Sequence, residues 1–293
     1  MTNEKDYEKA DEQVEGYTQK RQPGIEKDME PKPIIIADDY KGSEKLTGKV
    51  ALITGGDSGI GRSVAVHFAK EGADIAILHL QEEREDAEYT KTLIEKENVR
   101  CRLYSGNINK AEVRKNTVSD IVEHFGTINI LVNDAGVQFP KKDFLSITEE
   151  NLRETFETNI ISMILLTQEV YPHLEAGDTI INSTSVTAFK GSPVFIDYSS
   201  TKGAITSFTR SLAQNLAPEK IRVNAVAPGP IYTPLIPATF DAEGVEEHGA
   251  DKPMGRRGQP SELGPSYVFL AAHDSSYMTG EVLHVNGGDF TSS

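Results

Sequence analysis

The stretch TGGDSGIG, from Thr54 to Gly61, separates an apolar run from a helical pattern and has the glycine spacing Gly-x3-Gly-x-Gly. A strand-to-helix turn of this kind needs glycine, because its backbone adopts unusual dihedral angles, a pyrophosphate approaches the bare main chain, and the helix packs close to the strand. Free N–H groups and the dipole at the helix start favour phosphate. The context predicts a dinucleotide-binding turn; the alternative is a tight turn without a ligand. The residues predicted to contact the dinucleotide here are Gly55, Asp57, Ser58, Gly59, Ile60 and Gly61.

From Gly48 onward, short apolar runs alternate with longer amphipathic stretches, in which apolar residues recur every three or four positions, as in Ile60, Val64 and Phe68. Most runs are continuously apolar, which is typical of parallel strands covered on both faces. The alternation predicts an α/β fold with a doubly wound, seven-stranded parallel sheet and helices on both faces. The predicted strands are Val50–Thr54, Ile75–Leu80, Val99–Tyr104, Ile128–Asn133, Thr179–Asn182, Ile221–Ala227 and Val282–Val285.

Composition excludes several classes of partner. The chain has 293 residues and a formal net charge of −15, so it repels phosphate backbones and anionic lipid headgroups, and we expect neither nucleic acid nor membrane as a partner. Its one cysteine, Cys101, cannot form an intrachain disulfide, which fits a reducing compartment. No apolar run has the length of a signal core or a membrane span, so we expect a cytoplasmic protein.

The stretch FIDYSSTKGAITSF, from Phe195 to Phe208, places Tyr198 four residues before Lys202. On a helix these two side chains share one face. A phenol with an ordinary pKa of about 10 is unsuited to proton transfer at neutral pH, but a nearby ammonium favours the phenolate and lowers that pKa. The spacing therefore predicts an acid/base usable near pH 7. An isolated pair of this kind has a plainer alternative, a surface Tyr/Lys pair.

Together these two motifs resemble those of the short-chain dehydrogenase/reductase family. Four further stretches stand in the family's order: NDAG (133–136), FETN (156–159), NSTS (182–185) and PGPIYT (228–233). The resemblance covers roughly residues 46–290, and Asp134 departs from it, because the family has a second asparagine there. The stretches at Gln22–Gly24 and GSEKL (42–46) further resemble a subgroup, the bacterial general stress protein oxidoreductases, also described as glucose/ribitol dehydrogenase-like.

The resemblance implies an NAD(P)-dependent oxidoreductase that transfers a hydride between nicotinamide and an alcohol or carbonyl substrate. Tyr198 moves the proton, Ser185 hydrogen-bonds the substrate oxygen, Lys202 also holds the nicotinamide ribose, and Asn159 anchors a water that links Lys202 to solvent. The expected catalytic residues are Asn159, Ser185, Tyr198 and Lys202. The expected cofactor-binding residues beyond the glycine turn are His79, Asn107, Ile108, Asn133, Ala135, Gly136, Tyr198, Lys202, Pro228, Gly229, Ile231 and Thr233.

Some neighbouring residues receive no role. Ser183 and Ser199 lie off the expected positions, and the histidines lack metal-ligand spacing, so we expect no metal. Glu82, Glu83 and Glu85 are most simply a solvated helix start.

The choice of cofactor is usually made at the end of the second strand, where an acidic residue selects NAD and a basic one selects NADP. His79 and Leu80 give neither signal, and Glu82 and Glu83 repel a 2′-phosphate, so we expect both cofactors to bind, with NAD preferred. Asn107 replaces the family's aspartate at the adenine, where an amide can both donate and accept hydrogen bonds.

We expect an N-terminal extension over residues 1–45 and a single Rossmann-type dehydrogenase domain over residues 46–293. The extension is too polar to fold alone; it is either a disordered tail or an arm along the domain or a neighbouring subunit. Residues 234–258 are the expected substrate lid. A sugar or polyol, a small aldehyde or ketone, and an acyl thioester are candidate substrates, and the acidic charge disfavours the thioester.

Two other functions fit parts of the sequence: an NAD(P)-binding sensor without catalysis, and a nucleotide-sugar epimerase, whose glycine spacing is shorter. The resemblance also implies a homotetramer. Small residues on one face of the helix that begins near Tyr198, and the apolar stretch 277–290, suit subunit contacts. We expect residues 23–36 to pack on the domain or across a subunit boundary, and roughly the first dozen residues to stay mobile.

Overall fold

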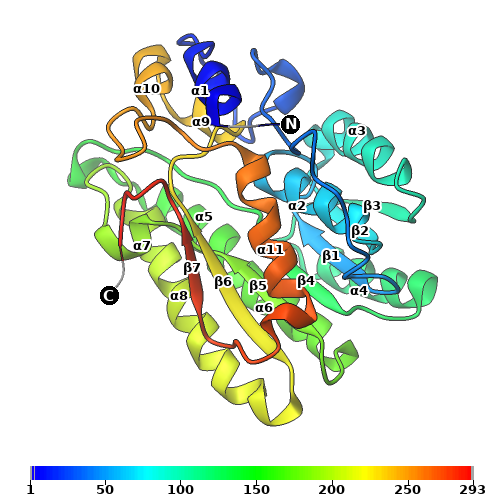
Figure 1. Ribbon diagram of the computed structural model, residues 1–293. Helices are drawn as coiled ribbons and strands as arrows, with labels where there is room; N and C mark the ends of the chain where they lie inside the picture. The colour runs from blue at the N-terminus through cyan, green and yellow to red at the C-terminus, as the bar shows by residue number, and fades with distance from the viewer. Residues whose placement is uncertain (1, 3, 292–293) are drawn as a thin grey trace.

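Seven parallel strands form one sheet in the computed structural model, which describes residues 2 and 4–291 (Figure 1). Their spatial order is β3-β2-β1-β4-β5-β6-β7, so the order reverses between β1 and β4. This confirms the predicted doubly wound parallel sheet, and each predicted strand lies within two residues of an observed one. The strands are β1 (Val50–Thr54), β2 (Asp74–His79), β3 (Cys101–Ser105), β4 (Ile130–Asn133), β5 (Thr179–Ser183), β6 (Arg222–Pro228) and β7 (Val282–Val285).

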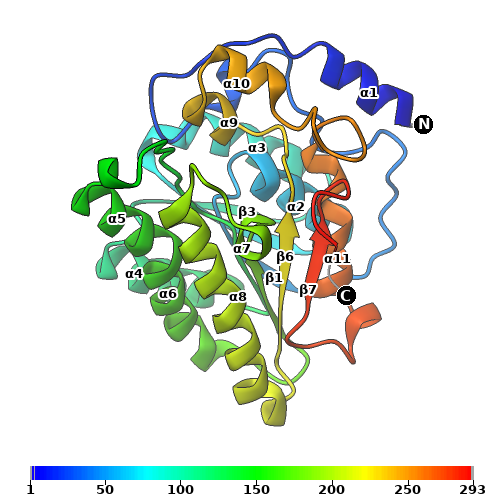
Figure 2. The same cartoon turned by 90° about the vertical axis from the view of Figure 1, so that its left-hand side faces the viewer.

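Helices cover both faces of the sheet, and Figure 2 shows the two layers on either side of it. One layer contains α2 (Gly59–Lys70), α3 (Arg84–Glu95) and α11 (Gly264–Ala271). The other contains α4 (Ala111–Phe125), α5 (Glu149–Phe156), α6 (Ser162–Val170) and α8 (Ile196–Leu216). The short helices are α1 (Glu4–Glu12), α7 (Thr187–Lys190), α9 (Leu235–Thr239), α10 (Ala242–Glu247), η1 (Glu26–Asp28), η2 (Gln81–Glu83), η3 (Phe144–Ser146), η4 (Glu157–Ile161), η5 (Tyr171–His173), η6 (Ala217–Glu219), η7 (Pro260–Glu262) and η8 (His273–Ser275).

The sheet separates two apolar cores. Because successive side chains of a strand point to opposite faces, Ala51 and Ile53 of β1 join the core under α2 and α11. Val50 and Leu52 of the same strand join the core under α4, α6 and α8. Every residue of β1 is buried. This burial explains the unbroken apolar sequence of the strand, and the glycine turn follows directly at its carboxyl end.

The N-terminal extension packs on the domain. Its apolar side chains Val14 and Met29 form a small core with Tyr232 and with Ile236 and Val245 of the expected lid. Met29 is fully buried. The segment from 23 to 36 thus lies against the same chain, one of the two arrangements predicted for it.

The stretch expected to stay mobile contains a helix. Residues Glu4–Glu12 form α1, which lies near α10 at the end of the molecule toward which the strands point (Figures 1 and 2). Arg256 pairs with Glu4 at 2.7 Å between Nε and Oε1, and Arg257 pairs with Asp11. Both arginines are buried, and each has a carboxylate of α1 as its charged partner. The composition of the extension alone does not reveal these two ion pairs.

We predict that Met29→Ala lowers the free energy of unfolding by about 2–5 kcal/mol, because the methionine is buried in a packed core. Thermal and urea unfolding measure this. Lys20→Ala, at an exposed position of the same extension, is the matched control and should change stability by less than about 0.5 kcal/mol. Equal and negligible effects of the two substitutions would show that the extension is only a tail.

Candidate active site

A cavity of about 540 Å³ opens at the carboxyl end of the sheet, where the strand order reverses. Open α/β sheets bind ligands at this place, because the loops after the strands diverge there. The walls come from the ends of β1, β2, β4, β5 and β6, from α8, and from the regions of the extension and of the expected lid. Residues far apart in the sequence therefore line the same cavity.

The glycine turn forms one wall of the cavity and is as tight as its sequence predicts. Gly55 has φ +68°, and a Cβ there would lie 3.2 Å from the Cα of Ala135. A Cβ on Gly61 would lie 2.0 Å from the carbonyl oxygen of Gly55, which no side chain permits. Gly59 has φ +52° and lies against Thr233. This cradle of bare main chain fits the pyrophosphate of a dinucleotide.

One N–H group of the turn is already occupied. The N–H of Gly59 donates to the carboxylate of Glu26 at 2.6 Å, and Glu26 also pairs with the guanidinium of Arg62. Both side chains are buried. Burial raises the pKa of Glu26 to about 7, and the charge of Arg62 opposes that rise. The prediction that the N–H groups at this helix start are free for phosphate is thus wrong for Gly59.

The predicted proton-transfer pair lies on α8, facing the same cavity. Lys202 Nζ donates to the carbonyl oxygen of Ser183 at 2.8 Å and lies 5.3 Å from the ring centre of Tyr198. Ser185 hydrogen-bonds the Tyr198 phenol and also accepts from the backbone N–H of Thr187 at 3.1 Å. A tyrosine, a serine and a lysine thus converge on one point, where a substrate oxygen can accept a proton and a hydrogen bond.

The pKa values of Tyr198 and Lys202 differ from the expectation of a phenol whose pKa is lowered by the ammonium. Burial raises the pKa of Tyr198 to about 12, and the charge of Asp134 adds to that rise. Burial lowers the pKa of Lys202 to about 8. Desolvation therefore outweighs the predicted lowering of the phenol pKa by the ammonium. The phenol is a proton donor at neutral pH.

Asn159 lies behind the cavity wall in η4, a single turn of π-helix that follows α5. Its amide accepts from the N–H of Val137 at 2.8 Å and donates to the carbonyl of Val137 at 2.9 Å. A Cβ on Gly136 would lie 3.4 Å from the amide oxygen of Asn159 and 3.8 Å from Lys202 Nζ. Asn159 thus shapes the loop after β4 next to Lys202, and π-helical turns often mark functional sites.

Most of the predicted cofactor residues line the cavity. At the end near β2 and β3, the ring nitrogen Nδ1 of His79 lies 2.7 Å from the carbonyl of Leu80, Asn107 accepts from the N–H of Asn109, and Ile108 is buried. Those on the remaining walls are Gly55, Asp57, Ser58, Gly59, Ile60, Ala135, Gly136, Tyr198, Lys202, Pro228, Gly229, Ile231 and Thr233. Ser185, predicted as a catalytic residue, also lines the cavity.

Asn133 and Gly61 lie outside the cavity lining. The amide of Asn133 donates to Asn182 at 2.9 Å and to Thr167 at 3.3 Å, so it joins β4 to β5. The amide oxygen of Asn133 is buried and has no hydrogen-bond partner. Asn133 is the last residue of β4 that pairs with β5, so its side chain lies within the sheet layer and not at the cavity.

Several lining residues were not predicted. Gln22, Pro23 and Gly24 of the extension border the cavity, and the Gln22 amide donates to the carbonyl of Gln138 at 2.6 Å. Glu83, expected to be a solvated residue, faces the cavity. Burial, and after it the charge of Asp57, raises the pKa of Glu83 to about 8. The tripeptide Gln-Pro-Gly was visible in the sequence, but nothing local showed what it would contact.

Asp134 and Ser183 also line the cavity, although Ser183 had been given no role. The Ser183 hydroxyl bonds to the carboxylate of Asp134 and to the hydroxyl of Tyr267. The one sign of this arrangement in the sequence is that Asp134 replaces the asparagine of the family motif.

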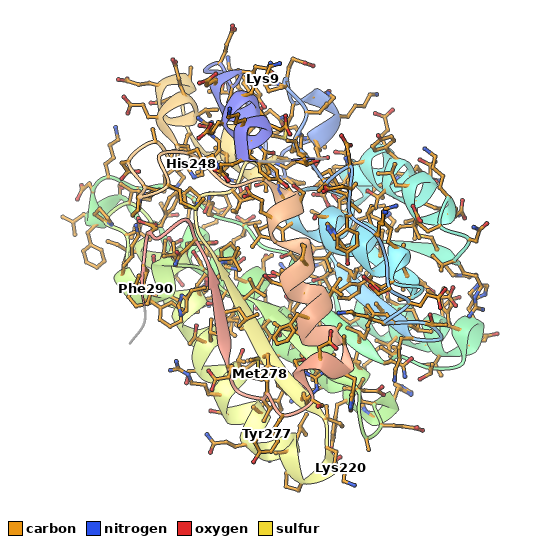
Figure 3. All side chains as sticks on the ribbon, in the orientation of Figure 1. Lys9, Lys220, His248, Tyr277, Met278 and Phe290 are labelled. Atoms are coloured by element: carbon orange, nitrogen blue, oxygen red, sulfur yellow. The ribbon has the colours of Figure 1, made fainter. Side chains whose placement is uncertain are left out.

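The region of the expected lid carries α9 and α10 and stands beside an aromatic row. The ring centres of Tyr198 and Phe195 are 5.9 Å apart, those of Phe195 and Phe240 are 5.7 Å apart, and those of Phe240 and His248 are 5.6 Å apart. Figure 3 labels His248 just below α10. Burial lowers the pKa of His248 to about 3, so this imidazole is neutral.

Among residues 2 and 4–291, no three His, Cys, Asp or Glu side chains are grouped so that they could hold a metal ion. Over the same residues, no helix has the length and apolar character needed to cross a membrane.

The chain matches a family model described as enoyl-(acyl carrier protein) reductase over residues 55–289. It is 54% identical to General stress protein 39 of Bacillus subtilis, covering 95% of this chain and 97% of that one. It is 48% identical to NADPH-dependent aldehyde reductase 1, chloroplastic, of Arabidopsis thaliana, covering 94% and 97%. It is 46% identical to the glucose and ribitol dehydrogenase of Daucus carota, covering 92% and 94%.

A solved short-chain dehydrogenase from Burkholderia cenocepacia, in complex with NADP, superimposes with a TM-score of 0.78 at 27% identity, covering 84% of this chain and 99% of that one. With the glycine turn and the parallel sheet, these matches show that the chain belongs to the short-chain dehydrogenase/reductase family. Within the family it is similar to the general stress protein and glucose/ribitol dehydrogenase-like oxidoreductases, as the sequence motifs predicted.

Proposed function

We propose that this protein is an NAD(P)-dependent dehydrogenase/reductase that interconverts an alcohol and its aldehyde or ketone, with Tyr198 as the acid/base. The observation that carries the proposal is the single cavity that joins the glycine turn to the Tyr198–Ser185–Lys202 group. A protein that only senses the dinucleotide has no need of a buried phenol with a serine and a lysine beside it.

A bound nicotinamide dinucleotide supplies the hydride acceptor or donor; the protein supplies geometry and handles the proton. In the reductive direction the carbonyl carbon gains a hydride, and its oxygen takes the proton of the Tyr198 hydroxyl. Ser185 donates a hydrogen bond to the same oxygen as negative charge develops there. Lys202 stabilises the phenolate that remains. In the oxidative direction the proton of the alcohol passes to the Tyr198 phenolate.

The charges around the cavity support a neutral substrate. Among the described residues that line it, Lys202 is the one lysine or arginine, whereas Asp57, Glu83, Asp134 and Glu154 are acidic. A polyanionic thioester would find one lysine and no arginine among these residues. We therefore propose a sugar, a polyol or a small aldehyde as the substrate class. The printed names of the aldehyde reductase and of the glucose and ribitol dehydrogenase agree with that class.

The same charge distribution bears on the cofactor. Among the described lining residues the one lysine or arginine is Lys202, which lies beside Tyr198 on α8, so the end of β2 offers a 2′-phosphate no such partner. We therefore propose that both dinucleotides bind and that NAD binds more tightly. The relatives give no support for an NAD preference, because their names include an NADPH-dependent reductase and an NADP complex.

We predict that Tyr198→Phe reduces turnover at least about a hundredfold and leaves dinucleotide affinity nearly unchanged, because only the transferable proton is lost. Stopped-flow absorbance and calorimetry measure the two quantities. Because the pKa of Tyr198 is raised to about 12, the reductive rate should stay flat across neutral pH, and the oxidative rate should rise with pH. Near wild-type turnover in Tyr198→Phe would rule out the assignment.

Leu80→Arg should shift preference toward NADP, because a guanidinium at the end of β2 offers a bidentate partner to the 2′-phosphate. Competing calorimetric titrations with NAD and NADP measure the ratio of dissociation constants. Leu80→Gln, which adds no charge, is the matched control and should leave the ratio unchanged. A wild-type protein that strongly prefers NADP would contradict the proposed preference.

A homotetramer is also part of the proposal. Gly203 on α8 has open space where a side chain would stand, and Tyr277 is fully exposed. Figure 3 labels Tyr277 near Lys220, at the opposite end of the molecule from α10. Two-fold contacts on such faces suit closed assembly. Light scattering should give four subunits per particle at micromolar concentration; a monomer would refute the assembly.

A cytoplasmic location, which the lone Cys101 supports, and a role in stress, which the name of General stress protein 39 suggests, complete the proposal.

A further inference from the structure

Asp134 is a carboxyl group beside the proton-transfer pair, at a position where the family motif has an amide. It follows the last residue of β4 and lines the same cavity as Tyr198 and Lys202. The parallel register pairs Asn133 with Asn182, so the next residue of each strand, Asp134 and Ser183, stand side by side. The pairing of two strand ends, and not sequence proximity, therefore brings this carboxyl group to the site.

A short chain of hydrogen bonds joins Asp134 to Lys202. The hydroxyl of Ser183 donates to the Asp134 carboxylate, and the hydroxyl of Tyr267 lies 2.6 Å from the same Ser183 oxygen. The carbonyl oxygen of Ser183 accepts from Lys202 Nζ at 2.8 Å. Asp134 and Tyr267 thus fix the side chain of Ser183, and the main-chain carbonyl of Ser183 accepts a hydrogen bond from the Lys202 ammonium. A shift of Ser183 would move the nitrogen that faces Tyr198.

We propose that Asp134 is a positioning residue of the proton-transfer site: its carboxylate anchors Ser183, which holds the Lys202 ammonium, and places a negative charge beside that ammonium and the Tyr198 phenol. The inference rests on the proposed function, in which Tyr198 moves the proton.

The electrostatics agree with the contacts. Burial lowers the pKa of Lys202 to about 8, and the charge of Asp134 opposes that fall. The same charge contributes to the raised pKa of Tyr198. A negative charge disfavours loss of a proton from both groups, so its effects on the two have the same sign. Burial raises the pKa of Asp134 itself, against the bond from Ser183, the charge of Lys202 and the backbone N–H of Gly61.

The groups that face this carboxyl come from four other elements, of which β5 contributes the hydroxyl of Ser183. The titratable ones are Lys202 and Tyr198 on α8 and Tyr267 on α11, while α2 contributes the N–H of Gly61. Burial and the charge of Asp134 both raise the pKa of Tyr267, so this phenol is neutral. Lys202 is therefore the cationic partner of Asp134 among these groups.

Asp134→Asn separates charge from shape, because an amide oxygen can still accept from Ser183 but carries no charge. We expect the rise of the oxidative rate and the alkaline fall of the reductive rate both to move to lower pH, by about one unit. Asp134→Glu keeps the charge and should restore the wild-type inflections. If the amide variant does not fold, Asp134→Ser removes the charge in the same way.

Asp178→Asn is the matched control. Asp178 is also buried, accepts from the amide of Asn129 at 3.0 Å, and precedes β5 at the opposite edge of the sheet from the cavity. Its substitution should leave the inflections unmoved, whatever it does to stability.

A second measurement does not depend on turnover. The ¹³Cε chemical shift of Lys202, assigned by comparison with Lys202→Arg, reports the protonation of the amine in cofactor-free protein. Its midpoint should fall by about one pH unit in Asp134→Asn and stay unchanged in Asp178→Asn. Unmoved inflections and an unmoved NMR midpoint in Asp134→Asn would overturn the proposal. An absence of hydride transfer from every protein, together with a shifted midpoint, would sink the proposed function and leave the placement of Asp134 intact.

Discussion

The close approach of α2 to β1 is the constraint on which the site depends. Because a Cβ on Gly61 would stand 2.0 Å from the carbonyl oxygen of Gly55, the helix start can lie directly over the strand end. The cradle of main chain formed in this way faces the carboxyl ends of β4, β5 and β6, which lie beyond β1 in the sheet. Thr54 extends it, since its hydroxyl accepts from the N–H groups of Asp134 and Ala135 at 3.0 and 3.1 Å. The loop after β4 is thereby fixed to the glycine turn.

Buried charge ties the N-terminal extension to this cradle. Arg62 lies one residue beyond the turn and is 3% exposed, and its partners Glu26 and Asp86 are each 2% exposed. Burying ions costs several kcal/mol each, so such a group persists only where every charge has close partners. Glu26 comes from the extension, and Asp86 comes from α3 and also accepts from the N–H of Glu26 at 2.7 Å. Removal of the extension would leave Arg62 and the turn with fewer partners.

The sequence predicted the features that depend on local residue patterns, namely the strands and the glycine turn. The buried strands have continuous apolar runs, so all seven were predicted to within two residues. The glycine turn was recognised because its steric demands leave no other residue type. The contacts of the extension were not predictable, because Gln22 meets Gln138 through folding of the whole chain. The raised pKa of Tyr198 was missed for a related reason: helix spacing shows that Lys202 is near, but it does not show how deeply both groups are buried.

Isotope transfer tests the central claim, that the cavity brings a nicotinamide ring to the Tyr198 group for hydride transfer. The protein is mixed with reduced dinucleotide carrying deuterium on one face of C4 and with a small aldehyde, and the alcohol product is analysed by mass spectrometry. The account predicts one deuterium on the carbinol carbon from one C4 face and none from the other, with the hydroxyl proton derived from solvent. Alcohol that forms without label from either face, or a reduced dinucleotide that binds and is never oxidised by any aldehyde, sugar or ketone, would contradict it.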